Sequence, residues 1–566
     1  MKLPKLPPHL EDFAPKLVTC LRGYGPRTLG ADVLAGVTVG LVALPLAMAF
    51  AIASGMPPQA GIYGAIVAGF LISALGGSRT QIGGPTGAFV VVVAGIVTQH
   101  GVDGLFMCTL MAGVLLMAMG LTGLGTAVDF IPRPVVIGFT NGIAVLIAST
   151  QLRDFFGLHL DHVPGEFIGR MRVLFEARGT WLPQATALAA GTLAVIAVMR
   201  RLSPRVPGVV VALVAGTAVA WLGGVGVETI GSRFGGIPTG LPRVVVPHFR
   251  PDLILPLLAP TVAVAMLGAI ESLLSAVVAD QMSGDKHNPN VELFAQGVAN
   301  VCSPLVGGLP ATGAIARTAT NIRMGAQTPV SGIVHALTLL ALLLVASPLA
   351  AHVPLAVLAG ILMVVAYNMG AWSETREILR LSKADVSVWL ITFVLTVLAD
   401  LEVAVQSGMI LAALLYIRKV TATTTVSRVT PEYVEAGFPH SLQTNPMPEG
   451  VAVYRIHGPF LFGSTEKLAL VEDELPSLPR VVVLRLRNMT AIDATGLHAL
   501  ERLADHVHAS GRELVLCGMR DQPARLMAKA KFHEHIGDDN IVPSLEAAIG
   551  RARALLGGAA GQTAGG

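Results

Sequence analysis

Two short stretches of the sequence combine glycine, proline and threonine in a pattern that could hold an anion. They read Gly83-Gly84-Pro85-Thr86-Gly87-Ala88 and Gly307-Gly308-Leu309-Pro310-Ala311-Thr312-Gly313-Ala314. A helix that begins inside a membrane leaves its first amide N–H groups unpaired, and its dipole places roughly half a positive charge at that end. Two such ends facing each other attract an anion, and glycine lets a ligand approach the backbone closely. The alternative is that these residues only mark loops between ordinary helices.

Two charged residues lie in apolar surroundings. Arg317 follows the second stretch by a few residues, where a charge at bilayer depth costs at least about 2.5 kcal/mol. Glu271 lies in the middle of an apolar run, with Ser275 one helical turn further on. We expect Arg317 to contact the anion. We expect Glu271 to carry a coupled proton, with assistance from Ser275. Alternatively, Arg317 extends to the cytoplasmic surface or forms a static pair with Glu271, and Ser275 only stabilises its helix.

The composition indicates which elements position these residues. Of the 566 residues, 53% are hydrophobic and 13% are charged, whereas a soluble protein has roughly 25% charged residues. Membrane segments must therefore make up most of the chain. Seven apolar runs lie near residues 32–51, 60–77, 86–99, 104–123, 131–151, 184–199 and 208–225, and seven more near residues 261–279, 291–304, 313–323, 328–348, 352–369, 385–400 and 402–417.

The third and tenth runs are too short to span a bilayer alone, and both contain residues of the glycine-rich stretches. A short, Gly/Pro-interrupted segment at the same place in each half is typical of a transporter built from an inverted repeat, with its binding site at these segments. Seven segments per half also make the two halves run in opposite directions. The sequence therefore predicts an α-helical polytopic membrane protein with 14 transmembrane segments in two inverted repeats of seven.

Basic residues in short loops set the predicted orientation. They precede the first segment and follow the sixth, twelfth and fourteenth segments, at Lys2, Lys5, Lys16, Arg22, Arg27, Arg200, Arg201, Arg205, Arg376, Arg380, Lys383, Arg418 and Lys419. These positions fall on one side, so we expect both termini in the cytoplasm and the loops near 153–180 and 227–252 outside. No cleavable signal peptide is visible, so we expect the first segment to direct insertion into the lipid bilayer of a bacterial inner membrane.

The composition changes to that of a soluble domain after Arg418. Apolar runs at Val451–Ile456, Val481–Leu486 and Leu514–Cys517 alternate with helix-like segments, which predicts a small cytoplasmic α/β domain. We divide the chain into an N-terminal cytoplasmic segment (1–30), a transmembrane domain (31–420), a linker (421–448), the α/β domain (449–555) and a disordered tail (556–566).

The sequence argues against several other classes of protein. The net charge of +3 is small and the basic residues are scattered, so nucleic-acid binding has no support. The four cysteines lie far apart, without the spacing of a metal site, and we expect no metal and no cofactor. Neither half offers a nucleophile, a base and an orienting group together, so an enzyme is not expected.

Taken together, these motifs resemble the SulP family of sulfate permeases, anion transporters that include the mammalian prestin and pendrin proteins. The resemblance rests on Asp32–Gly40, Ala43–Phe50, Gly83–Phe89, Phe130–Val135, Gly138–Thr140, Glu271–Asp280 and Gly307–Asn321. It implies that a core of helices 1–4 and 8–11 moves against a gate of the remaining helices in an elevator-like way, with the substrate between helices 3 and 10. It also implies a homodimer and identifies the α/β domain as a regulatory STAS domain.

The resemblance assigns the anion site by position. It would involve Phe50, Ala88, Phe89, Ala316 and Arg317, beside Gly313 and Ala314 at the second half-helix end. Leu46 stands where several relatives have Gln, so a polar contact from helix 1 is missing. Ile315 stands where sodium-coupled relatives have a hydroxyl residue, and sodium needs several oxygen ligands. We therefore favour proton coupling, or none, over sodium.

The predicted STAS domain contains Asp493-Ala494-Thr495-Gly496-Leu497 before a helix. In the related anti-sigma-factor antagonists the hydroxyl residue before this glycine is phosphorylated, so Thr495 is a candidate regulatory site that a protein partner would recognise. The other interpretation is that Thr495 is the N-cap of the helix.

These observations favour a secondary active transporter that takes up a small anion together with protons. Sulfate, bicarbonate and C4-dicarboxylates such as fumarate all suit a site made of helix dipoles and an arginine, so the substrate stays open. One alternative is a membrane sensor that binds the anion and signals through the STAS domain. Another is an anion channel.

Overall fold

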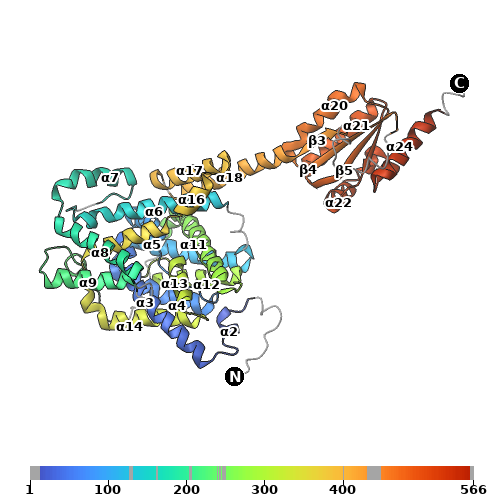
Figure 1. Cartoon of the computed structure of the whole chain (residues 1–566). Coiled ribbons are helices and arrows are strands. Elements are labelled where there is room, and N and C mark those ends of the chain that lie inside the picture. Colours follow the sequence, from blue (N-terminus) through green and yellow to red (C-terminus); the bar gives the residue numbers. More distant parts are fainter. Residues whose placement is uncertain are drawn as a thin grey trace. The chain divides into compact units, whose positions relative to one another are not determined.

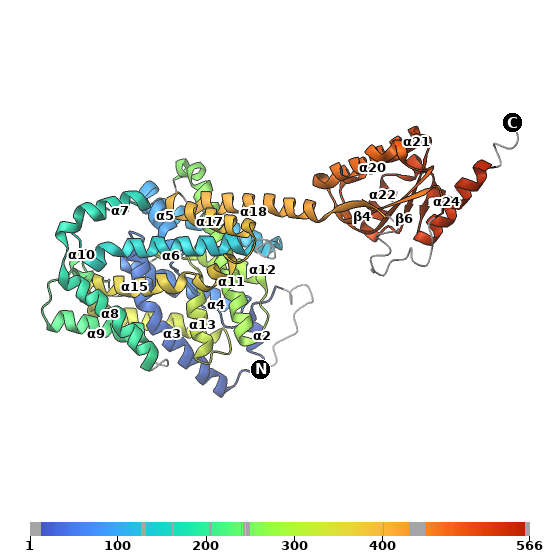
Figure 2. The same cartoon turned by 45° about the horizontal axis from the view of Figure 1, so that its top comes forward.

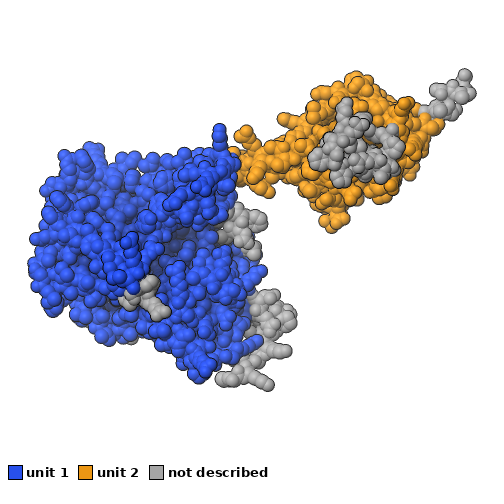
Figure 3. Space-filling view, in the orientation of Figure 1, with its two compact units in different colours: residues 1–410 blue, residues 411–566 orange. Residues whose placement is uncertain are grey.

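The computed structural model describes residues 13–125, 132–160, 163–202, 207–238, 240, 244, 250–399, 401–429 and 448–560 (Figure 1). The chain forms two compact units, Met1–Ile410 and Leu411–Gly566 (Figure 3). Several predicted features lie outside the described residues, namely Lys2, Lys5, Phe130, Ile131, Arg205, residues 1–12 of the N-terminal segment, most of the linker and the tail after residue 560.

The first unit is almost entirely helical. Its main helices are α3 (Pro26–Ala53), α4 (Pro58–Leu75), α5 (Phe89–Leu121), α6 (Arg133–Phe156), α8 (Pro183–Leu202), α9 (Gly208–Leu222), α11 (Ile254–Ser283), α12 (Pro289–Cys302), α13 (Ile315–Arg323), α14 (Val330–Ala350), α15 (Leu355–Met369), α17 (Lys383–Leu398) and α18 (Leu401–Thr423), which continues into the second unit. Each predicted apolar run falls on one of them, and eight of the described helices are long and apolar enough to cross a membrane. The predicted polytopic helical fold is confirmed.

The third and fourth predicted runs form one element, α5. This helix is interrupted at Gly101, whose φ of 72° and ψ of −175° are not helical and are open to glycine. The shorter helices, which the apolar runs do not predict, are α2 (Lys16–Cys20), α7 (Phe167–Glu176), η2 (Ala177–Thr180), α10 (Ile230–Phe234), η3 (Pro251–Leu253), η4 (Pro304–Val306) and α16 (Trp372–Ile378).

The helices of the first unit pack mainly within two groups. One group contains α3, α4, α5, α11, α12, α13 and α14, and the other contains α6, α8, α9, α15 and α17. Contacts between the groups are fewer, and they involve mainly α3 with α6, α9 and α15, and α5 with α6. The first group corresponds to helices 1–4 and 8–11, and we call it the core group. We call the second the gate group.

A buried carboxylate holds the turn after α13 against α3. Asp32 Oδ1 accepts hydrogen bonds from the backbone N–H groups of Gln327 (2.7 Å) and Thr328 (3.1 Å). Asp32 Oδ2 accepts from the hydroxyl groups of Thr328 (2.6 Å) and Tyr24 (3.1 Å). Because hydrogen bonds to an ionised group are strong, this cluster ties the second half of the core group to the first.

The second unit is built on a five-stranded sheet (Figure 2). Its strands lie in the order β3 (Thr425–Arg428), β4 (Val451–Phe460), β5 (Val481–Ile492), β6 (Glu513–Cys517) and β7 (Ile541–Val542). β3 is antiparallel to β4, and the other neighbours are parallel. The helices are η5 (Phe462–Leu468), α20 (Ala469–Glu474), η6 (Leu475–Ser477), α21 (Ala494–Ala509), α22 (Asp521–Lys529), α23 (His533–Ile536), η7 (Asp538–Asn540) and α24 (Leu545–Ala560).

The sheet of the second unit is buried on both faces. Alternate residues of β5 belong to two separate apolar clusters, one that includes side chains of α21 and one that includes side chains of α24. Burial on both faces explains why Val481–Leu486 reads as an almost continuous apolar run in the sequence. The predicted small α/β domain is confirmed.

Two elements of the second unit extend beyond the limits predicted for the α/β domain. β3 lies within the residues assigned to the linker, and only Val426 of its four residues is buried, so the strand has no visible period in the sequence. α24 continues to Ala560, past residue 556, where the tail was expected to begin.

The N-cap of α21 is Asp493 and not Thr495. Asp493 Oδ1 accepts a hydrogen bond from the N–H group of Gly496 (2.7 Å), and Oδ2 accepts from the N–H group of Phe462 (3.0 Å). Thr495 lies in the first turn of the helix with its side chain exposed. The interpretation of Thr495 as the cap is therefore wrong, because the aspartate already fills that position.

Replacing the cap should loosen the start of α21. We expect Asp493→Ala to destabilise this turn by about 1 kcal/mol, because two backbone donors lose their acceptor. Thr495→Ala should change the turn little. Amide hydrogen exchange of the intact protein would measure both effects at Gly496. Equal loss of protection in the two variants would contradict the assignment of the cap.

Candidate anion-binding site

Two antiparallel strands of two residues each cross inside the first unit. β1 (Gly83–Gly84) pairs with β2 (Thr312–Gly313), with Gly83 opposite Gly313 and Gly84 opposite Thr312. All four residues are buried. The antiparallel pairing is the one expected of two halves that run in opposite directions. Because α5 and α13 begin a few residues after these strands, the crossing brings the N-terminal ends of both helices together.

The backbone donors at the two helix ends are only partly used. Ala314 donates its N–H to the carbonyl oxygen of Ile82 (2.8 Å), and Ile82 donates its N–H to Thr318 Oγ1 (3.0 Å). In the described part of the chain, the N–H groups at these ends that donate no hydrogen bond include those of Gly87, Ala88, Ile315, Ala316 and Arg317. Neither helix has a side-chain cap. Unpaired donors at the positive ends of two helices form a site that favours an anion.

Two glycines allow the strands to cross. Gly84 has a φ of +146°, and a Cβ atom there would lie 2.7 Å from Nη1 of Arg317. A Cβ atom on Gly313 would lie 1.7 Å from Nε2 of Gln81. Both distances are shorter than real Cβ contacts, so a larger residue at either position would push these side chains away.

Arg317 is buried beside the crossing, with only 4% of its surface exposed. Its guanidinium group donates a hydrogen bond to the backbone oxygen of Pro85, which belongs to the opposite stretch. No carboxylate oxygen of the described residues lies within 4.0 Å of it, although Glu271 is near enough to interact electrostatically. Arg317 therefore neither reaches the cytoplasmic surface nor forms a static pair with Glu271, the two alternatives to a role at the site.

Glu271 and Ser275 of α11 contact opposite halves of the crossing. Glu271 Oε2 accepts a hydrogen bond from Thr86 Oγ1 (2.8 Å), just before α5. Ser275 shares a hydrogen bond with Thr318 Oγ1 on α13 (3.1 Å). Ser275, which was expected to assist Glu271, thus has its hydrogen-bond partner on α13, whereas the partner of Glu271 lies just before α5.

Apolar side chains border the start of α5, at the meeting of the core and gate groups. Phe50, Ala88 and Phe89 are nearly fully buried. A Cβ atom on Gly87 would lie 3.3 Å from Cε1 of Phe50 on α3 and 2.9 Å from Cδ1 of Ile147 on α6. The N-terminal end of α5 therefore faces both the core group and the gate group.

The start of α13 is the more accessible side of the site. Gly313 and Ala314 are buried, whereas Ile315 and Ala316 are exposed. Ile315 presents a hydrocarbon side chain and no oxygen ligand at this accessible position. The predicted site residues thus come from α3, the two half-helix ends and α11, which the fold brings to the β1–β2 crossing.

A second buried carboxylate, which the sequence reasoning did not identify, supports the crossing from α12. Glu292 Oε2 accepts from the N–H groups of Gly77 (3.0 Å) and Ser78 (3.2 Å), and Oε1 accepts from Gln296 (3.0 Å). The Ser272 hydroxyl group approaches Oε1 at 3.4 Å. A carboxylate within the apolar run 291–304 is the signal that could have revealed this residue.

The chain is similar to known anion transporters over nearly its whole length. A family model described as the sulfate permease family matches residues 29–392, and a STAS domain model matches residues 444–548. YvdB of Bacillus subtilis is 40% identical over 91% of this chain and 96% of its own length. The bicarbonate transporter BicA of Synechocystis is 33% identical over 94% of this chain and 95% of its own length.

A solved structure shares the fold of this chain. The structure of the murine anion transporter Solute Carrier 26 family member A9 in its inward-facing state has a TM-score of 0.84 and covers 98% of this chain and 96% of its own. At 18% sequence identity, this likeness concerns the fold.

Gly313→Ala should disrupt the crossing. The added methyl group would displace Gln81, which donates hydrogen bonds to the backbone oxygen (3.2 Å) and Oγ (3.1 Å) of Ser272. We expect anion affinity to fall at least about tenfold, the equivalent of one or two lost buried hydrogen bonds, and to recover in part in Gly313→Ala/Gln81→Ala.

The matched control is Gly95→Ala on α5, where a Cβ atom would meet nothing within 4 Å. Isothermal titration of the purified variants with the anion would measure the effect. An unchanged affinity in Gly313→Ala, or an equal loss in Gly95→Ala, would show that the crossing does not set anion affinity.

Proposed function

Since this chain belongs to the sulfate permease family, we propose that it is a secondary active transporter that moves a small anion across the membrane together with a proton. The observation that carries the proposal is the β1–β2 crossing, which places two uncapped helix N-termini beside the buried cation Arg317. Sulfate and bicarbonate are the substrates that the names of the family and of BicA suggest, and C4-dicarboxylates such as fumarate suit the same site.

In the proposed site, hydrogen-bond donors at fixed positions replace the hydration shell of the anion. Removing an anion from water is costly unless charged and polar partners take over its hydrogen bonds. The unpaired N–H groups at the starts of α5 and α13 and the guanidinium group of Arg317 provide such partners. Phe50, Phe89 and the buried alanines border these donors with apolar surface, which lowers the local dielectric and strengthens the attraction.

Coupling to a proton would depend on the charges of Arg317 and Glu271. Without the anion, the positive charge of Arg317 lies near enough to Glu271 to interact with its carboxyl group. A bound anion offsets that positive charge, so Glu271 takes up a proton more readily when the site is filled. Anion and proton would then cross together. The Thr86 hydroxyl group, which contacts Glu271 at 2.8 Å, links this carboxyl group to the end of α5.

The remaining parts of the proposal concern movement and regulation. The core group carries the crossing, and its few contacts with the gate group would let it move as one body in an elevator-like way. The STAS domain would regulate this movement, with the exposed Thr495 as the modified residue and a protein partner as its reader. We further propose a homodimer in a bacterial inner membrane with both termini in the cytoplasm.

Arg317→Ala should weaken anion binding by several-fold to a hundredfold, or about 1–3 kcal/mol, because one charged donor is lost. Arg317→Lys should recover part of the loss. Arg323→Ala is the matched control, because Arg323 lies on the same helix but is exposed. Anion-induced shifts of the melting temperature would measure the effect. The assignment would be wrong if Arg317→Ala bound the anion as tightly as Arg323→Ala.

Glu271→Gln should abolish anion accumulation driven by a proton gradient while anion binding persists. The amide oxygen of glutamine can still accept the hydrogen bond from Thr86 but cannot carry a proton. Uptake of radiolabelled anion into proteoliposomes, with and without an inward proton gradient, measures the coupling. Continued concentration of the anion by the variant would place the coupled proton on another residue.

A further inference from the structure

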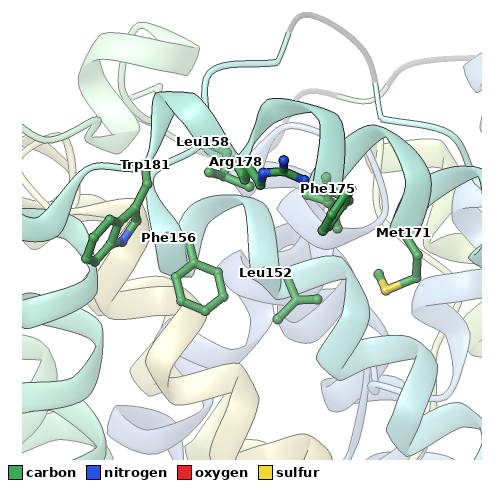
Figure 4. Close-up of a pocket in the computed structure, with 8 residues that line it drawn as sticks. Leu152, Phe156, Leu158, Met171, Phe175, Arg178 and Trp181 are labelled. Carbon is green, nitrogen blue, oxygen red and sulfur yellow. The ribbon is translucent and has the colours of Figure 1, made fainter.

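A separate pocket lies beside the C-terminal end of α6, away from the β1–β2 crossing. It has a volume of about 450 Å³. Leu152 and Phe156 line it from α6, Met171 and Phe175 from α7, and Arg178 and Trp181 from the segment that follows α7 (Figure 4). The lining is apolar except for the guanidinium group of Arg178 and the indole nitrogen of Trp181.

The rim of this pocket exposes large apolar side chains. Phe175 on α7 is 67% exposed, and Ile168 on the same helix is exposed to a similar degree. Trp181 is 54% exposed. In water, such a concentration of apolar surface is unfavourable. α6 is one of the helices long and apolar enough to cross the membrane, and the pocket lies where this helix ends. Aromatic residues and short amphipathic helices are typical of this level, where headgroups meet acyl chains.

Arg178 supplies one cation at the pocket. Its guanidinium carbon lies 4.1 Å from the centre of the Phe175 ring, so it is held over an apolar wall. Among the described residues, no carboxylate oxygen lies within 4.0 Å of its side chain. The neighbouring Glu176 pairs with Arg172 instead, at 3.0 Å. The charge of Arg178 is therefore not neutralised by these residues.

We propose that this pocket binds an anionic phospholipid, with an acyl chain inside the cavity and the phosphate group on Arg178. A water-soluble ligand of this size usually meets several convergent polar groups, and the pocket offers few. A lipid needs only an apolar cavity that opens at headgroup level and one cation at its mouth. Charge complementarity thus selects a lipid with a net negative headgroup over a zwitterionic one.

Native mass spectrometry of the delipidated full-length protein tests this site. The probes are dioleoyl phosphatidylglycerol and dioleoyl phosphatidylcholine, which share their acyl chains and differ in headgroup charge. We expect the protein to prefer phosphatidylglycerol, and Arg178→Gln to bind it about fivefold more weakly, as expected for one interfacial cation. Arg201→Gln is the matched control, because it also removes one exposed arginine charge, and Arg201 on α8 does not line the pocket. The affinity of this control variant for phosphatidylglycerol should stay unchanged.

A second variant separates the acyl chain from the headgroup. Met171→Trp should fill part of the cavity and weaken both lipids, while the melting temperature in detergent shows whether the variant is folded. Equal binding of phosphatidylglycerol by the unmodified protein, Arg178→Gln and folded Met171→Trp would overturn the proposal. A polypeptide that copurifies with the protein and is displaced by neither lipid would overturn it as well.

Discussion

The backbone has no water to bond with inside a bilayer, and the β1–β2 crossing is how this chain meets that constraint at its centre. A helix that starts within the membrane exposes donors that must find partners. Here the two broken segments pair with each other through Gly83–Gly84 and Thr312–Gly313. Among the donors that follow, the N–H groups of Gly87, Ala88, Ile315, Ala316 and Arg317 find no partner among the described residues. The same crossing thus satisfies part of the backbone and leaves the rest for a ligand.

Hydrogen bonds to three helices of the core group hold this crossing in place. Asn300 of α12 both donates to and accepts from the backbone of Ala311, at 2.8 Å in each case. Thr312 Oγ1 donates to the carbonyl oxygen of Gly268 on α11 (2.8 Å). Asn321 of α13 donates to the carbonyl oxygen of Thr80 (2.9 Å). Buried hydrogen bonds between neighbouring elements rigidify a site, so we expect the helix ends to keep their positions without a bound anion.

The sequence predicts well which segments are membrane helices and which charged residues lie within them. It does not show which side chain contacts which neighbour. The apolar runs and the two broken segments follow from composition, and the positions of Arg317 and Glu271 stand out as charges in apolar surroundings. The partners of Ser275 and the role of Glu292 depend on how α11, α12 and α13 rotate against one another. Strands of two residues, such as β1, have no periodicity to detect, so their register becomes visible only in the fold.

The central claim is that an anion binds between the starts of α5 and α13, beside Arg317. A structure of the full-length protein crystallised with selenate, an oxyanion of the shape and charge of sulfate, would test it directly through the anomalous scattering of selenium. We predict an anomalous peak within hydrogen-bonding distance of the N–H groups of Ala88 and Ala316 and of the Arg317 guanidinium group. A peak elsewhere in the membrane unit, with none at the two helix ends, would contradict the claim.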